Sequence, residues 1–213
     1  MRELAPDVWQ LDGRPANAIN VYVIGDVLVD AGTVFDRGRI LAQLRERTVS
    51  AHALTHAHLD HYGASRAITT ALRVPMWCGA NDVACVEAGT MIGPFGRAIP
   101  AAPSVHVDRA LSEDDDVAGF VVLDTPGHSP GHVSYWRESD RTLLCGDVLW
   151  GWNPFLMRGG MREPPRLVNP DHEQNRRSAR RLAELEPALV CFGHGLPCRD
   201  TAAFTAAVSA LGR

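Results

Sequence analysis

A short run of histidine and aspartate residues carries the strongest chemical signal in this sequence. The run reads T-H-A-H-L-D-H, and its metal-capable side chains are His56, His58, Asp60 and His61. Neutral imidazole nitrogens and carboxylate oxygens are the ligands that zinc prefers where thiolate is absent. A lone histidine is usually a surface or hydrogen-bonded core residue, but burying four such groups together without a metal would be costly. The run therefore predicts a metal site.

Three more candidate ligands follow at long range. They are His128 in T-P-G-H-S-P-G-H, Asp147 in L-L-C-G-D-V-L-W and His194 in C-F-G-H-G. Seven such groups are too many for one tetrahedral ion, but they suffice for two ions that share a ligand and keep positions open for water. Open positions are typical of catalytic sites, whereas structural zinc sites are closed.

Each group of candidates follows a segment with the composition of a β-strand. These segments are Ala51–Thr55 before the run, Phe120–Asp124 before His128, Thr142–Cys145 before Asp147 and Ala188–Phe192 before His194. Side chains at i and i+2 of an extended segment point the same way, so His56 and His58 can reach one ion. Asp60 and His61 follow as the chain turns into a helix, and they can point to a neighbouring ion.

The rest of the chain predicts further strands with helices between them. Strands are expected at Val8–Leu11, Ile19–Ile24, Val27–Asp30, Val74–Cys78 and Val133–Arg137. Helices are expected at Phe35–Arg47, from Asp60 or His61 to Leu72, from Asn81, from Asn169-Pro170 to about Glu186, and after an Asp200 cap. Thr90–Pro103 and Gly151–Val168 read as loops. We expect an α/β fold of one domain over residues 1–213: a four-layer αββα sandwich of two mixed sheets with helices outside.

Composition excludes several classes of protein. Net charge is -4 at pH 7 and no basic tract stands out, so a nucleic-acid partner is not expected. No apolar stretch is long enough to span a bilayer, and the N-terminus lacks the apolar core of a signal peptide. The five cysteines form no C-x-x-C pair, which favours a reducing compartment. We therefore expect a cytoplasmic protein with a small-molecule substrate; its oligomeric state stays open.

The run and the three later motifs together resemble the signature of a known family. T-H-A-H-L-D-H is similar to the H-x-H-x-D-H motif of metallo-β-lactamase-fold hydrolases, and the later motifs occur in that family's order. The resemblance extends from about Val27 to His194. It implies the αββα fold that the pattern of strands and helices also predicts.

The resemblance also implies a role for each matching residue. His56, His58 and His128 match the ligands of the first metal, Asp60, His61 and His194 those of the second, and Asp147 the carboxylate that bridges them. His132 resembles a second histidine that is not normally a ligand, and Asp30 resembles an early aspartate that hydrogen-bonds ligand histidines. Carboxylates of that kind fix the orientation of imidazole ligands.

Within the family, the sequence looks most like the glyoxalase II (hydroxyacylglutathione hydrolase) branch. G-H-S-P-G-H and the G-D after a strand are typical there. The commonest class of zinc β-lactamases instead has cysteine at the position of Asp147 and D-N at Gly131-His132. Glyoxalase II also has a C-terminal helical domain that grips glutathione, and only 19 residues follow His194 here.

These observations predict a hydrolase with two divalent ions, zinc by preference and iron or manganese as alternatives. We expect a hydroxide bridging the ions to attack an ester, thioester or lactone carbonyl, with Asp60 as the catalytic residue that handles its proton. Phosphodiester or nucleic-acid cleavage, β-lactamase-type amide hydrolysis and iron-dependent oxidation within the same fold remain alternatives. After Asp147, the side chains of Trp150, Trp152, Phe155 and Arg158 are candidates for a substrate wall, or else for a self-packed loop or an oligomer contact.

Overall fold

The larger sheet of this protein is built mainly from the N-terminal half of the chain. A computed structural model describes residues 1–93, 97–153 and 158–212, and over these ranges the sheet has seven strands in the order β1-β2-β3-β4-β5-β6-β9. The strands are β1 (Arg2–Ala5), β2 (Val8–Gln10), β3 (Tyr22–Ile24), β4 (Val27–Val29), β5 (Ala51–Ala53), β6 (Met76–Gly79) and β9 (Arg109–Leu111). The first four pair antiparallel, and β4, β5, β6 and β9 pair parallel.

The second main sheet comes from the C-terminal half. Over the same described ranges it has five strands in the order β10-β11-β12-β13-β16. They are β10 (Asp116–Val117), β11 (Phe120–Asp124), β12 (Val133–Arg137), β13 (Thr142–Gly146) and β16 (Leu189–Phe192). Only the pairing of β13 with β16 is parallel among these strands. Both sheets are therefore mixed, as the sequence predicts.

Both faces of each sheet are buried, because apolar side chains project from both sides of its strands. Tyr22 and Ile24 pack in the cluster between the sheets, whereas Val21 and Val23 pack on the opposite face beneath the helices. Because successive side chains of a strand point to opposite faces, a strand covered on both sides is apolar at nearly every position. The parallel strands β4 and β5 are buried throughout, and the polar His52 of β5 has its Nε2 atom 2.8 Å from Ser65 Oγ.

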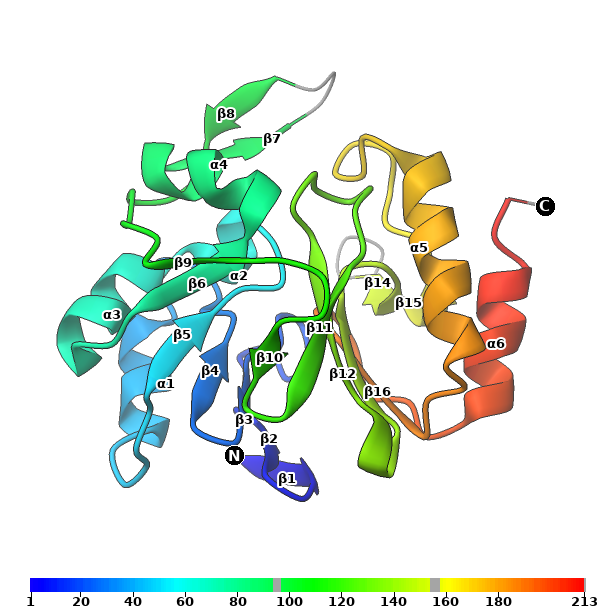
Figure 1. Cartoon of the computed structure of the whole chain (residues 1–213), viewed down its shortest axis with the longest axis horizontal. Coiled ribbons are helices and arrows are strands. Elements are labelled where there is room, and N and C mark those ends of the chain that lie inside the picture. The colour runs from blue at the N-terminus through cyan, green and yellow to red at the C-terminus, as the bar shows by residue number, and fades with distance from the viewer. Residues whose placement is uncertain (94–96, 154–157, 213) are drawn as a thin grey trace.

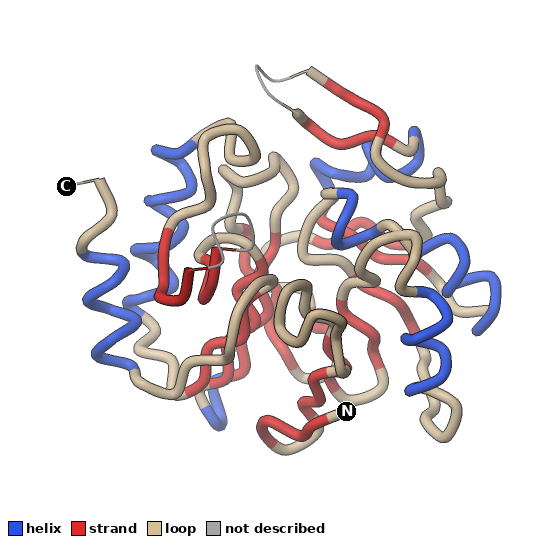
Figure 2. Tube along the Cα trace, turned by 180° about the vertical axis from the view of Figure 1, so that it is seen from behind, coloured by secondary structure: helices blue, strands red, loops and turns tan. Residues whose placement is uncertain are grey.

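Helices cover the outer face of each sheet. Figure 1 shows α1 (Arg37–Gln43) and α3 (Ser65–Leu72) on one side of the molecule, with α5 (His172–Glu184) and α6 (Thr201–Ser209) on the other. The view from behind in Figure 2 shows the same helix–strand–helix arrangement. Ile40 and Ile68 pack on the first sheet, and Leu182 and Phe204 pack on the second. The four-layer αββα sandwich is thus confirmed.

Short helices complete the connections. They are α2 (Leu59–Tyr62), α4 (Val83–Ala88) and the 3₁₀ turns Ala80–Asp82 and Glu138–Asp140. The single helix expected from Asp60 or His61 to Leu72 is interrupted at Gly63 and Ala64. A Cβ on Gly63 would lie 2.7 Å from backbone atoms of Thr33, so the chain makes a close approach at this break.

Three local predictions were wrong in part. The segments read as loops each contain a hairpin: β7 (Thr90–Ile92) with β8 (Ala98–Pro100), and β14 (Trp150–Asn153) with β15 (Arg158–Arg162). Helix α5 does not begin at Asn169-Pro170; it is capped by Asp171, whose carboxylate accepts a hydrogen bond of 2.9 Å from Gln174 N. The N-cap at Asp200 is as predicted: its carboxylate accepts a hydrogen bond of 2.9 Å from Ala203 N.

None of the helices in the described part of the chain is both long and apolar enough to cross a membrane.

Candidate metal centre

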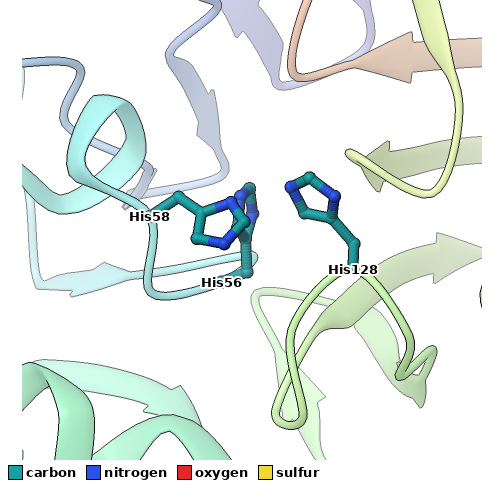
Figure 3. Close-up of side chains that lie close together, drawn as sticks. All are labelled: His56, His58 and His128. Carbon is teal, nitrogen blue, oxygen red and sulfur yellow. The ribbon is translucent and has the colours of Figure 1, made fainter. Parts of the chain in front are cut away.

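The seven predicted ligands lie together at one edge of the two sheets. His56 and His58 follow β5, Asp60 and His61 lie on α2, and His128 lies in the loop between β11 and β12. Asp147 follows β13 and His194 follows β16, and these parallel strands end side by side at the pair Gly146–Phe192. Figure 3 shows the rings of His56, His58 and His128 converging from two loops. The sheet topology, rather than nearness in sequence, brings these side chains together.

One oxygen of Asp147 lies at the centre of the histidines. Its Oδ2 atom is 3.2 Å from His194 Nε2, 3.3 Å from His128 Nε2, 3.6 Å from His61 Nε2 and 4.0 Å from His56 Nε2. The carboxylate is buried, with 2% of its side chain exposed. A buried carboxylate surrounded by imidazole rings has the geometry of a ligand that can bind more than one cation.

The ligand atoms form three groups, within each of which they all lie within 4.8 Å of one another. The groups are His56, His58 and His128; His56, His61 and Asp147; and Asp60, His61 and His194. The first and last groups have no member in common, and the middle group takes one histidine from each and adds Asp147. Each of the three groups could hold a metal ion, and Asp147 belongs to the middle one.

Several polar atoms of the cluster lack a hydrogen-bond partner among the described residues. They include His56 Nε2, His58 Nε2 and Asp147 Oδ1, all buried. A buried polar atom without a partner costs about 1–3 kcal/mol, more for a charged one, so native proteins seldom leave several side by side. Imidazole nitrogens and a carboxylate are suitable ligands for zinc, iron or manganese. The residues present thus fit a divalent metal centre.

Electrostatics divides the cluster into neutral and charged parts. Burial lowers the pKa of His58 to about 3, and burial together with the adjacent His61 lowers that of His56 well below its usual value. Both rings are therefore neutral near pH 7, with a lone pair available. Burial alone would raise the pKa of Asp147, but His194 and His61 hold it well below its usual range. Burial alone would lower the pKa of His194 and of His61, but Asp147 raises the pKa of His194 to about 10 and that of His61 well above its usual value. A divalent cation that binds these two rings would therefore displace their protons.

Asp30 and Thr55 orient two of the candidate ligands. Asp30 Oδ2 accepts hydrogen bonds from His61 Nδ1 at 2.8 Å and from Thr55 Oγ1 at 2.9 Å. The Thr55 hydroxyl lies 3.0 Å from His56 Nδ1 and can accept its proton. Both rings then direct Nε2 toward Asp147. Asp30 itself has a left-handed φ of 63°, a conformation that Asn and Asp tolerate better than most side chains.

His132 supports Asp147 and does not lie in any of the three ligand groups. Its Nε2 accepts a hydrogen bond of 3.1 Å from Asp147 N, and its Nδ1 lies 2.8 Å from Thr125 Oγ1. The ring also packs beside Gly146, where a Cβ would lie 2.6 Å from His132 Nε2. His132 therefore fixes the backbone from which the central carboxylate projects.

Sequence reasoning missed Asp82. This buried carboxylate accepts hydrogen bonds from Ala57 N at 2.8 Å, Gly131 N at 2.8 Å and Ser129 Oγ at 2.6 Å. It therefore joins the segment between His56 and His58 to the loop that carries His128. The sequence shows only an Asn-Asp pair at a helix start, so its long-range partners had no local signal.

The N-terminal loop braces the last ligand in a similar way. His194 Nδ1 donates a hydrogen bond to Ala18 O, which leaves Nε2 facing Asp147 and Asp60. Asn20 Nδ2 donates to Phe192 O at 2.9 Å and to Gly195 O at 2.8 Å, on either side of the histidine. These contacts span more than 170 positions and were likewise not predicted from the sequence.

A cavity of about 230 Å³ opens onto the cluster. It is lined by His58, Leu59, Asp60, Met91, His128, Asp147, Trp150, Val168 and His194. Of the predicted substrate wall, Trp150 lines this cavity and its ring meets His194 edge-on at 4.9 Å. Trp152 is not among the lining residues. Phe155 lies outside the described residues, as does the side chain of Arg158.

Comparison with known proteins identifies the family. The sequence profile of the metallo-β-lactamase superfamily matches residues 14–194. The chain belongs to the metallo-β-lactamase superfamily. Membership in this superfamily, together with the His/Asp cluster, supports a metal-binding hydrolase.

Relatives within the superfamily differ in their described activities. The probable metallo-hydrolase YflN of Bacillus subtilis is 30% identical over 87% of this chain and 83% of its own. The hydroxyacylglutathione hydrolase of Bdellovibrio bacteriovorus is 29% identical over 78% of this chain but only 56% of its own. The crystal structure of the BLEG-1 B3 metallo-β-lactamase is 29% identical, with a TM-score of 0.67 over 90% of this chain and 93% of that one.

Replacing Asp30 by Asn tests its role in orienting the ligands. Asparagine suits the left-handed backbone but removes the charge and turns one acceptor oxygen into a donor. We expect Asp30→Asn to lower zinc affinity about 10- to 100-fold, measured by competition with a chromogenic chelator. Asp26→Asn, at an exposed position in the nearby turn, is the matched control. Equal affinity in the two variants would contradict the assignment.

Asp82 gives a second prediction, on stability. Replacing it by Ala leaves two backbone N–H groups and one hydroxyl unpaired in a buried place, so we expect the free energy of unfolding to fall by about 3 kcal/mol. Ser129→Ala removes one of the three bonds and should have a smaller effect. Urea denaturation of the apo-proteins measures both. A change in Asp82→Ala no larger than in Ser129→Ala would refute the bridging role.

Proposed function

We propose that this protein is a hydrolase that uses two divalent metal ions on an ester, thioester or lactone carbonyl. The observation that carries the proposal is the pair of ligand groups without a common member, with Asp147 between them. A structural site needs four ligands around one ion, whereas this cluster has seven candidates and opens onto a cavity.

The seven candidate ligands divide between the two proposed ions. His56, His58 and His128 would hold the first, Asp60, His61 and His194 the second, and Asp147 would contact both. Two divalent ions in such a site polarise a carbonyl and lower the pKa of water enough to supply a nucleophile near neutral pH. We propose zinc as the metal because nitrogen and oxygen ligands suit it well, and iron and manganese are the alternatives.

Asp60 is the residue that we assign to proton handling. Its side chain keeps 30% of its surface exposed and lines the cavity, whereas Asp147 and His194 are buried to 3% exposure or less. Its Oδ2 lies 3.4 Å from His194 Nε2, which holds the carboxylate in place. Both carboxylates of the cluster line the cavity, and Asp60 is the more exposed of the two.

An acyl substrate is favoured by two observations. The Bdellovibrio relative is a hydroxyacylglutathione hydrolase, and His132 with Asp147 departs from the pattern of the commonest zinc β-lactamases. Hydrolysis of β-lactam amides is the second candidate, favoured by the similarity to the BLEG-1 enzyme over nearly the whole of both chains.

A substrate panel with the zinc-loaded protein tests the proposal. We expect hydrolysis of simple esters, thioesters and lactones to exceed that of β-lactams and bis-p-nitrophenyl phosphate. Asp60→Ala should lower kcat by orders of magnitude, since the proton then has no acceptor at the open end of the site. Asp60→Asn, which keeps the shape of the side chain, separates the loss of the base from a change in packing.

The metal content of each variant is measured together with its kinetics, which shows whether a loss of activity is caused by a loss of bound metal. Near-normal kinetics in Asp60→Ala would refute the role of Asp60. Two zinc ions per chain with activity on phosphodiesters alone would overturn the substrate class.

A further inference from the structure

A second, larger cavity adjoins the one at the metal cluster. It has a volume of about 900 Å³, and we call it the side groove. In each of three segments, one residue lines the metal cavity and its neighbour in the chain lines the side groove. Named in that order, the pairs are Met91 and Ile92 in β7, His128 and Gly127 in the β11–β12 loop, and Val168 and Leu167 before α5. Figure 1 shows these segments at the same end of the molecule. The side groove and the metal cavity therefore share three wall segments.

Apolar atoms contribute most of the exposed surface of the side groove. Five of its eleven lining residues are apolar, Ile92, Pro126, Pro130, Leu167 and Pro170, and the polar residues Asn169 and Gln174 line it as well. The charged residues along it are Arg166 and Asp171, of opposite sign, and the carboxylate of Asp171 already accepts the bond from Gln174 N. The lining His172 has its Nδ1 atom 2.9 Å from Glu163 Oε1. The side groove thus offers apolar surface and no net charge.

Hydrogen bonds hold the walls in place. Tyr62 is buried on α2, next to the candidate ligand His61, and its hydroxyl donates to Thr90 O at 2.7 Å, which ties β7 to the metal centre. On the opposite wall, Val168 N donates to Pro165 O at 3.0 Å, and Asp171 N donates to Gly127 O at 3.2 Å. The last bond joins two of the three segments directly. A preformed apolar groove binds a ligand without first having to be ordered.

We propose that the side groove binds an uncharged apolar part of the substrate, while the scissile carbonyl lies at the metal cluster. This inference rests on the proposed function and narrows its substrate class to esters and thioesters with a medium-length or long apolar chain. Glutathione carries two carboxylates and an ammonium group, and the side groove offers no matching set of charges. Leu167, 67% exposed at the rim, is the residue best placed to select for chain length without supporting the core.

The experiment measures kcat/KM of the zinc-loaded protein for p-nitrophenyl esters from acetyl to decanoyl. We expect kcat/KM to rise about fourfold per added methylene while the chain lies in the side groove. Leu167→Asp should lower the value for the octanoyl ester about tenfold and leave the acetyl ester unchanged. Phe35→Asp introduces the same charge at an apolar residue that is 91% exposed and is not among the residues lining either cavity, so it is the matched control.

Hydrolysis of the acetyl ester without a chain-length preference would overturn the side-groove assignment and leave the proposed function standing. An equal loss on short and long esters in Leu167→Asp would overturn it as well. A protein that hydrolyses none of the series, and no thioester or lactone of the substrate panel, contradicts the proposed function, and calorimetric titration with octanamide then decides on the groove alone. Binding that is lost in Leu167→Asp and kept in Phe35→Asp supports the assignment, and no binding to the wild type overturns it.

Discussion

The burial of one carboxylate among imidazoles is the constraint on which the rest of this structure depends. Asp147 Oδ2 lies within 4.0 Å of nitrogen atoms from four histidines, and buried atoms of the cluster lack hydrogen-bond partners in the described part of the chain. Such a cluster is unfavourable by itself, because polar groups leave water without gaining partners. Divalent cations on either side of the carboxylate would supply them.

The scaffold holds this unfavourable cluster from outside. Asp30 orients His61 directly and His56 through Thr55, Asp82 joins two ligand loops, and His132 holds the backbone of Asp147. Glycine is required where the chain passes closest to the centre. A Cβ on Gly193 would lie 2.0 Å from Asp147 Oδ1, and one on Gly131 would lie 2.3 Å from Asp82 N. Substitution at either position would displace a ligand or its support.

The sequence predicts the ligands and the layers because both have local signals. The H-x-H-x-D-H run is contiguous, each later ligand follows an apolar strand, and a continuous apolar run such as Val21–Ile24 marks a strand buried on both faces. Asp82 and Asn20 have no such signal, since the two backbone partners of Asp82 lie 25 and 49 positions away and those of Asn20 lie 172 and 175 positions away. The sequence indicates loops at the hairpins Thr90–Pro100 and Trp150–Arg162 because both segments are rich in glycine and proline, although pairing between their two arms forms strands. The sequence predicts the start of α5 two residues early, because Asn169-Pro170 resembles a cap and Asp171 is the cap in the structure.

The central claim is that two divalent ions flank Asp147. Anomalous diffraction at the zinc edge, from crystals of the protein loaded with zinc, tests it most directly. The account predicts two peaks: one among His56, His58 and His128, the other among Asp60, His61 and His194, with Asp147 between them. A single peak at full zinc saturation, or zinc bound away from these residues, would contradict it.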